Sequence, residues 1–120
     1  MESQREEILL KSVLSKKIKR VRKDKGITLQ QLAKEVGSSK SYMWQLENSS
    51  DINPSAQLIS KIAEALGTTV DYLLGPNQED MTVDDEISVF FRDFKKLNAN
   101  TQKGLMAQVE ALKKLQKKDD

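Results

Sequence analysis

Residues 26–47 read GITLQQLAKEVGSSKSYMWQLE and decide the fold, because they predict two short helices joined by a tight turn. Thr28, followed three residues later by Gln31, is the pattern of a capping box at the start of the first helix. Apolar residues recur from there at helical spacing up to Gly37, which suits the left-handed backbone that commonly ends a helix. Ser39 is then placed to cap the second helix.

The second helix, predicted over residues 40–48, has an apolar inner face and a polar outer face. Met43 and Leu46 point inward at helical spacing. A helix, a short turn and a helix with a polar, basic outer face form the helix-turn-helix arrangement, in which the second helix enters the DNA major groove. The alternative is an ordinary helical hairpin in an all-helical core.

Three spaced segments around this motif resemble the Cro/C1-type (Xre) family of bacterial and phage helix-turn-helix regulators. They are IKRVRKDKGITLQQLAKEVGSSKSYMWQLEN from residue 18, INPSAQLISKIAEALG from residue 52 and TTVDYLL from residue 68. KSYMWQLE followed by NPS is particularly similar to the SinR type of biofilm repressor. The resemblance implies a five-helix lambda-repressor-like domain that binds DNA.

Four side chains on the outer face of the second helix are expected to contact bases: Lys40, Ser41, Trp44 and Gln45. Lysine can donate to guanine O6 or N7, serine to several acceptors, and glutamine can pair with adenine N6 and N7. Trp44 is expected either to reach a thymine methyl group or sugar atoms, or to fold back over the loop of residues 49–51.

Six residues are expected to contact the DNA backbone: Arg20, Lys23, Gln30, Tyr42, Asn48 and Ser49. Leu29 stands where the family commonly has a phosphate-binding glutamine, so one of the two glutamines after it takes that place or the contact is missing. Tyr42 either reaches a phosphate with its hydroxyl or packs in the core. The resemblance also implies a structural ion pair between Arg22 and Glu47, whose own worth is small if it is largely exposed.

The composition bounds the chemistry. The chain has 120 residues, of which 38% are hydrophobic and 32% charged, and it has no Cys and no His. Disulfides, thiolate–imidazole zinc sites, cysteine nucleophiles and histidine bases are therefore excluded. No apolar run is long enough for a membrane span or a secretory signal. We expect no enzyme activity, no cofactor and no metal, and a reducing cytoplasm fits.

Charge is unevenly distributed along the chain, although the net charge is only +2. Seven basic residues lie within residues 16–25, opposed there only by Asp24, whereas many of the acids fall in the second half. This asymmetry favours a nucleic-acid-binding end and a protein-binding end. The alternative is an ordinary solvated helix face.

We expect an all-α protein with a DNA-binding domain at residues 1–75, a linker at residues 76–83 and a helical hairpin at residues 84–118. The first helix is expected from about Glu6. Asn53, directly before a proline, is expected to cap the fourth helix.

The hairpin is predicted from two amphipathic helices. Thr82 and Asp85 signal the start of the first, and Asn100 or Thr101 the start of the second. A hairpin this small cannot bury its apolar faces alone, so it packs on another copy or on the first domain. Six residues of its stripes are expected to mediate oligomerisation: Phe90, Phe91, Phe94, Leu105, Val109 and Leu112.

These observations predict a sequence-specific DNA-binding transcriptional regulator, a dimeric repressor of a palindromic operator. One alternative is an antitoxin or antagonist-controlled repressor whose hairpin binds a toxin, a peptidase or a small regulatory protein. Another is an interaction protein that no longer binds DNA. An enzyme is the weakest, since the consecutive acids at residues 84–86 are better explained by the helix dipole than by a metal site. A bacterial or phage-encoded cytoplasmic protein, at the nucleoid when bound, is expected.

Overall fold

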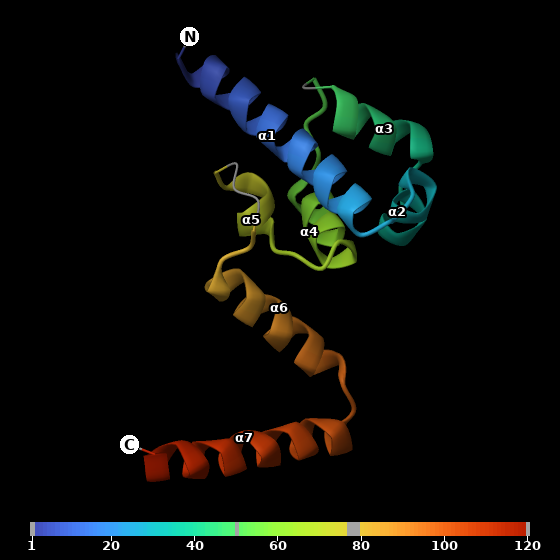
Figure 1. Ribbon diagram of the computed structural model, residues 1–120. Coiled ribbons are helices and arrows are strands. Elements are labelled where there is room, and N and C mark those ends of the chain that lie inside the picture. Colours follow the sequence, from blue (N-terminus) through green and yellow to red (C-terminus); the bar gives the residue numbers. More distant parts are fainter. Residues whose placement is uncertain (1, 50, 77–79, 120) are drawn as a thin grey trace. The chain divides into compact units, whose positions relative to one another are not determined.

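The computed structural model describes residues 2–49, 51–76 and 80–119, and in these residues every regular element is a helix, as predicted. The chain divides into two compact units, residues 1–86 and residues 87–120. The helices are α1 (Glu2–Asp24), α2 (Leu29–Val36), α3 (Lys40–Asn48), α4 (Ala56–Ala65), α5 (Val70–Leu74), α6 (Val83–Lys96) and α7 (Ala99–Asp119) (Figure 1). Among the residues described, no helix is both long enough and apolar enough to cross a bilayer.

The first unit is built on one hydrophobic core. The long helix α1 packs against α3 and α5, α2 packs against α3 and α4, and α4 packs against α5 (Figure 1). Full burial of a large aliphatic side chain contributes about 1.5–3 kcal/mol. The core consists of Leu14, Ile18, Leu32, Ala33, Val36, Met43, Leu46, Ile59, Ile62, Ala63, Leu66, Tyr72 and Leu73.

The two helices of the central motif are capped as the sequence predicts. The Thr28 hydroxyl accepts the Gln31 backbone N–H at 3.0 Å, and the Gln31 side chain accepts the Thr28 backbone N–H at 2.9 Å, which completes the capping box. Gly37 has a φ of 72°, a conformation that residues with a Cβ rarely adopt. The Ser39 hydroxyl accepts the Tyr42 N–H at 3.1 Å. These caps fix the turn between α2 and α3, and so they help to position α3 within the first unit.

Three predicted helix starts are wrong. Helix α1 begins at Glu2 rather than near Glu6. Helix α4 is capped by Ser55 and not by Asn53, because the Ser55 hydroxyl accepts the N–H of Leu58 at 3.1 Å.

The third error concerns α7, for which Asn100 or Thr101 was the predicted cap. The side-chain oxygen of Asn98 accepts the Thr101 N–H at 2.9 Å, so the helix begins one residue later, at Ala99. In both α4 and α7, several capping residues follow one another closely, and the sequence does not rank them.

The second unit leaves most of its large apolar side chains exposed, although Phe94 and Leu105 are half-buried. The side-chain amide of Gln102 donates to the carbonyl of Phe94 at 3.0 Å and so fixes the turn between α6 and α7. The rings of Phe90 and Phe94 stack with centroids 6.0 Å apart. Large hydrophobic residues that stay exposed in this unit are Ile87, Phe90, Phe91, Leu97, Met106, Val109, Leu112 and Leu115.

The domain boundaries expected from the sequence remain a prediction. The structure divides the chain after Glu86, so the first turn of α6 belongs to the first unit and not to the second. Residues 77–79 of the expected linker lie outside the described residues.

Candidate nucleic-acid interface

The outer face of α3 brings the four expected base-contacting side chains together. Its inner face buries Met43, Leu46 and Glu47, which hold the helix on the core. A shallow surface hollow of about 360 Å³ is lined by Lys40, Ser41, Trp44 and Gln45. Trp44 is 57% exposed, so its indole is open to solvent on this face, and its contact with DNA stays a prediction.

This face has the chemistry that base recognition requires. An ammonium, a hydroxyl, an indole and a primary amide lie within the first two turns of one exposed helix. The DNA major groove is about 12 Å wide and admits an α-helix, so such groups can reach the donors and acceptors of the base edges. The indole supplies an apolar surface of the kind that contacts a thymine methyl group.

A second hollow continues from this face toward the start of α2. It has a volume of about 550 Å³ and is lined by Arg22, Lys23, Gly26, Ile27, Thr28, Leu29, Gln30 and Lys40. It therefore unites two of the expected backbone-contacting residues, Lys23 and Gln30, with Lys40. Two ammonium groups and an amide beside a helix start suit the binding of a phosphate.

Arg22 and Glu47 form a two-pronged ion pair between α1 and α3. The Arg22 Nε and Nη2 atoms donate to the two Glu47 carboxylate oxygens at 2.7 and 2.9 Å. The side chains are only 11% and 1% exposed, so this is not the exposed pair whose worth would be small. The hydrogen bond to Glu47 raises the pKa of Arg22. Arg22 Nη1 also donates to the carbonyl of Ile27 at 2.9 Å, which anchors the turn before α2.

Three other expected backbone-contacting residues are engaged in contacts within the protein. Tyr42 is partly buried against the core. The Ser49 hydroxyl accepts the N–H of Asp51 at 3.1 Å. Arg20 donates to the Tyr72 hydroxyl at 2.8 Å, which is a contact with α5.

Asn48 is oriented by a residue that sequence reasoning missed. Its side-chain oxygen accepts a hydrogen bond from Lys19 at 3.0 Å, and its side-chain N–H donates to the Trp44 carbonyl at 2.8 Å. Lys19 lies three residues before Arg22 on α1. Lys19 binds Asn48 and Arg22 binds Glu47, so α1 contacts two successive residues at the end of α3. The sequence signal that could have identified Lys19 is its spacing of three residues from Arg22, which places both side chains on one face of α1.

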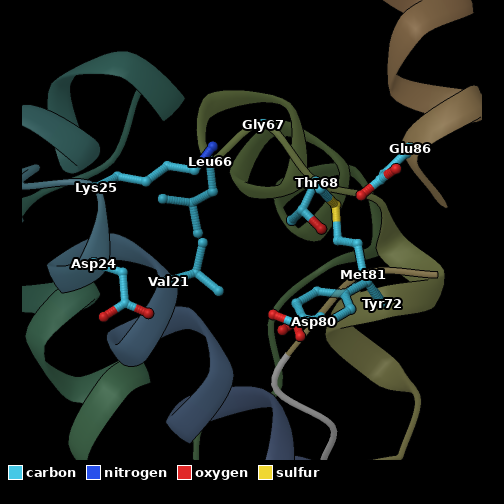
Figure 2. Close-up of a pocket in the computed structure, with 10 residues that line it drawn as sticks. All are labelled: Val21, Asp24, Lys25, Leu66, Gly67, Thr68, Tyr72, Asp80, Met81 and Glu86. Atoms are coloured by element: carbon cyan, nitrogen blue, oxygen red, sulfur yellow. The ribbon is translucent and has the colours of Figure 1, made fainter. Parts of the chain in front are cut away.

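A further hollow, of about 410 Å³, lies between the end of α1 and the loop before α5 (Figure 2). None of its lining residues comes from α2 or α3, so it is separate from the face described above. Its charged residues are Asp24, Lys25, Asp80 and Glu86.

The sequence of this chain is similar to a known family and to a known protein. The helix-turn-helix family model matches residues 18–73. The HTH-type transcriptional regulator SinR of Bacillus subtilis is 34% identical over 84 residues, which cover 68% of this chain and 76% of SinR.

Two solved structures are also similar. The complex of the SinR and SinI proteins matches with 27% identity and a TM-score of 0.51, over 84% of this chain and 98% of that one. The clp gene regulator ClgR of Corynebacterium glutamicum matches with 25% identity and a TM-score of 0.52, over 88% of each chain. The family to which these matched proteins belong is one of transcription regulators and not of enzymes. The chain therefore belongs to the Cro/C1-type (Xre) family of helix-turn-helix transcriptional regulators, and it is SinR-like.

Proposed function

We propose that this protein is a sequence-specific DNA-binding transcriptional regulator that reads bases with the outer face of α3. The observation that carries the proposal is the grouping of Lys40, Ser41, Trp44 and Gln45 around one exposed hollow of a capped, core-anchored helix. Each good contact to a base edge is worth about 1–3 kcal/mol of discrimination. The relative SinR, which carries the name of a transcriptional regulator, supports the proposal.

The backbone contacts would come from the adjoining hollow. Lys23 and Gln30 are the best placed, because they share that hollow with Lys40. Asn48, oriented by Lys19, would add a donor at the far end of α3. Phosphate contacts of this kind make affinity fall steeply as salt rises.

We further propose that the protein is a dimer joined through its C-terminal unit and represses transcription by occluding promoter DNA. The exposed stripe of α6 and α7 supports this, since side chains such as Phe90 at 53% and Leu112 at 63% exposure need a partner surface. A dimer of identical heads reads an inverted repeat. Acting on chromosomal DNA, it would work in the cytoplasm, at the nucleoid when bound.

A selection of genomic DNA fragments on the purified full-length protein, at near-physiological salt, tests this function. We expect enrichment of one inverted repeat whose half-sites are centred about 34–36 Å apart, which is one turn of DNA, or a multiple of that distance. Recovery of fragments without a shared sequence would contradict the proposal, because phosphate contacts alone carry no base information.

Replacing Leu112 with glutamate is expected to convert the dimer to a monomer. A carboxylate at the centre of a buried apolar interface loses its hydration without a partner, which is strongly unfavourable. Sedimentation equilibrium measures the mass directly. The control is Ala107→Glu, which adds the same charge on the opposite face of α7 and is expected to leave the dimer intact. If both variants remain dimers, the stripe is not the interface.

A second function would use the same stripe to bind a protein antagonist. The solved complex of SinR with SinI favours it, because a relative is there assembled with a second protein. A toxin or a peptidase remains an alternative partner predicted from the sequence. Co-purification of a stoichiometric partner from the native host would distinguish this function from a dimer that acts alone.

A further inference from the structure

Lys17 is almost fully buried on α1, although it belongs to the basic segment of the chain. Its ammonium donates to the backbone carbonyls of Tyr72 and Gly75, the second at 3.2 Å. Its Nζ atom also lies 4.5 Å from the centroid of the Tyr72 ring. Burial lowers the pKa of Lys17 and the nearby Arg20 adds to this effect, whereas Asp85 opposes it. A buried ammonium needs such partners, so Lys17 ties α1 to the end of α5.

Asp85 makes a matching connection from the first turn of α6. One carboxylate oxygen accepts the Thr69 hydroxyl at 2.8 Å, and the other accepts the Thr82 backbone N–H at 3.0 Å and its hydroxyl at 2.9 Å. The Thr69 hydroxyl also caps α5 by accepting the Tyr72 N–H at 3.0 Å. Burial alone would raise the pKa of Asp85, but the bonds from Thr69 and Thr82 and the charge of Lys17 hold it below its usual value.

The segment before α6 packs on the first unit as well. Met81 is partly buried against the core, and its side chain extends toward Thr68 in the hollow shown in Figure 2. Lys17 thus holds the chain at Gly75, and Thr69 holds it at Asp85, on either side of the segment whose composition predicts a linker. We call the four residues whose side chains make these bonds the Asp85 latch: Lys17, Thr69, Thr82 and Asp85.

We propose that the Asp85 latch fixes the point at which the chain leaves the first unit, and thereby sets the half-site spacing that the dimer accepts. This inference rests on the proposed dimeric reading of DNA. With the latch closed, the held chain ends at Asp85, and the exposed stripe begins at Ile87. Asp85 is in this sense a positioning residue, since it acts through the geometry of the dimer and not by contact with DNA.

The range of half-site spacings that the dimer would accept without the latch follows from the length of chain that the latch restrains. Without the bonds of Asp85, the chain between Gly75 and the start of α6 at Val83 would become a flexible tether of about seven residues, with a root-mean-square length of roughly 13–16 Å. Base pairs are stacked about 3.4 Å apart, so this reach corresponds to roughly four or five base pairs. A tether of that length would let the two heads meet half-sites at several separations.

The test compares full-length wild type, Asp85→Ala and Asp84→Ala on one inverted repeat whose spacer is changed in steps of one base pair. Asp84 is the matched control, because it is an exposed acid in the same helical turn. We expect wild type and Asp84→Ala to lose about tenfold or more in affinity at unfavourable spacings. Asp85→Ala is expected to bind all spacings within about threefold of one another, with unchanged affinity for an isolated half-site.

If Asp85→Ala keeps the spacing preference of wild type, or if wild type shows no preference, the latch does not set the spacing. Failure of wild type to bind the inverted repeat at every spacing would instead overturn the proposed function, and this inference with it. Circular dichroism checks that each variant folds. Should Asp85→Ala not fold, Asp85→Asn keeps the side-chain shape, removes the charge and one acceptor oxygen, leaves the cap of α5 in place and carries the same expectation.

Discussion

Replacing Arg22 with alanine is expected to lower the free energy of unfolding by about 3–5 kcal/mol, because it leaves a buried carboxylate without its partner. Glu47 is 1% exposed and receives two of its hydrogen bonds from Arg22. The same change frees the carbonyl of Ile27 from its bond to Arg22 and so loosens the turn before α2. Chemical denaturation followed by circular dichroism measures the loss.

Two controls distinguish the loss of stability caused by burial of the ion pair from that caused by the loss of one charge. Glu110→Ala breaks the exposed pair with Lys113, whose side chains are 64% and 61% exposed, and is expected to change stability by less than about 1 kcal/mol. The double variant Arg22→Leu/Glu47→Leu replaces the buried pair by apolar side chains and is expected to recover most of the stability. Equal losses in Arg22→Ala and Glu110→Ala would show that Glu47 is not held in a desolvated site.

Local signals in the sequence were enough to predict much of the first unit. The capping box at Thr28 and the left-handed Gly37 involve partners only a few residues apart, so the sequence contains both sides of each interaction. The outer face of α3 follows from helical periodicity alone. The choice of Ser55 over Asn53 did not follow, because both residue types are good caps and they lie only two positions apart.

The full set of long-range contacts that α1 makes could not be predicted. Lys17 was counted in the basic segment, yet its partners are carbonyls of Tyr72 and Gly75, groups that every residue carries. The resemblance implied the ion pair of Arg22 with Glu47, and the structure contains it, but no pattern in the sequence shows that the pair is buried. Asn48 was expected to reach DNA, but its orientation by Lys19 depends on how α1 crosses α3. Such contacts need the fold.

The double substitution Lys40→Ala/Gln45→Ala is expected to abolish the preference for the selected inverted repeat while leaving the fold intact. Both side chains are exposed and line the same hollow on α3, so their removal costs no core packing. With about 1–3 kcal/mol for each base contact, the pair accounts for roughly 2–6 kcal/mol per half-site, that is, about 30-fold to 10⁴-fold in affinity. Competition binding against a scrambled repeat at fixed salt measures the preference.

The control is Gln57→Ala/Lys61→Ala, which removes one glutamine and one lysine from the exposed face of α4. It changes the net charge equally, so any general electrostatic effect on DNA affinity is shared by both variants. We expect the α4 variant to keep the preference for the repeat, since α4 contributes no residue to either hollow at the motif. If the two variants bind the repeat alike, the outer face of α3 does not read bases, and binding by this protein comes from charge alone.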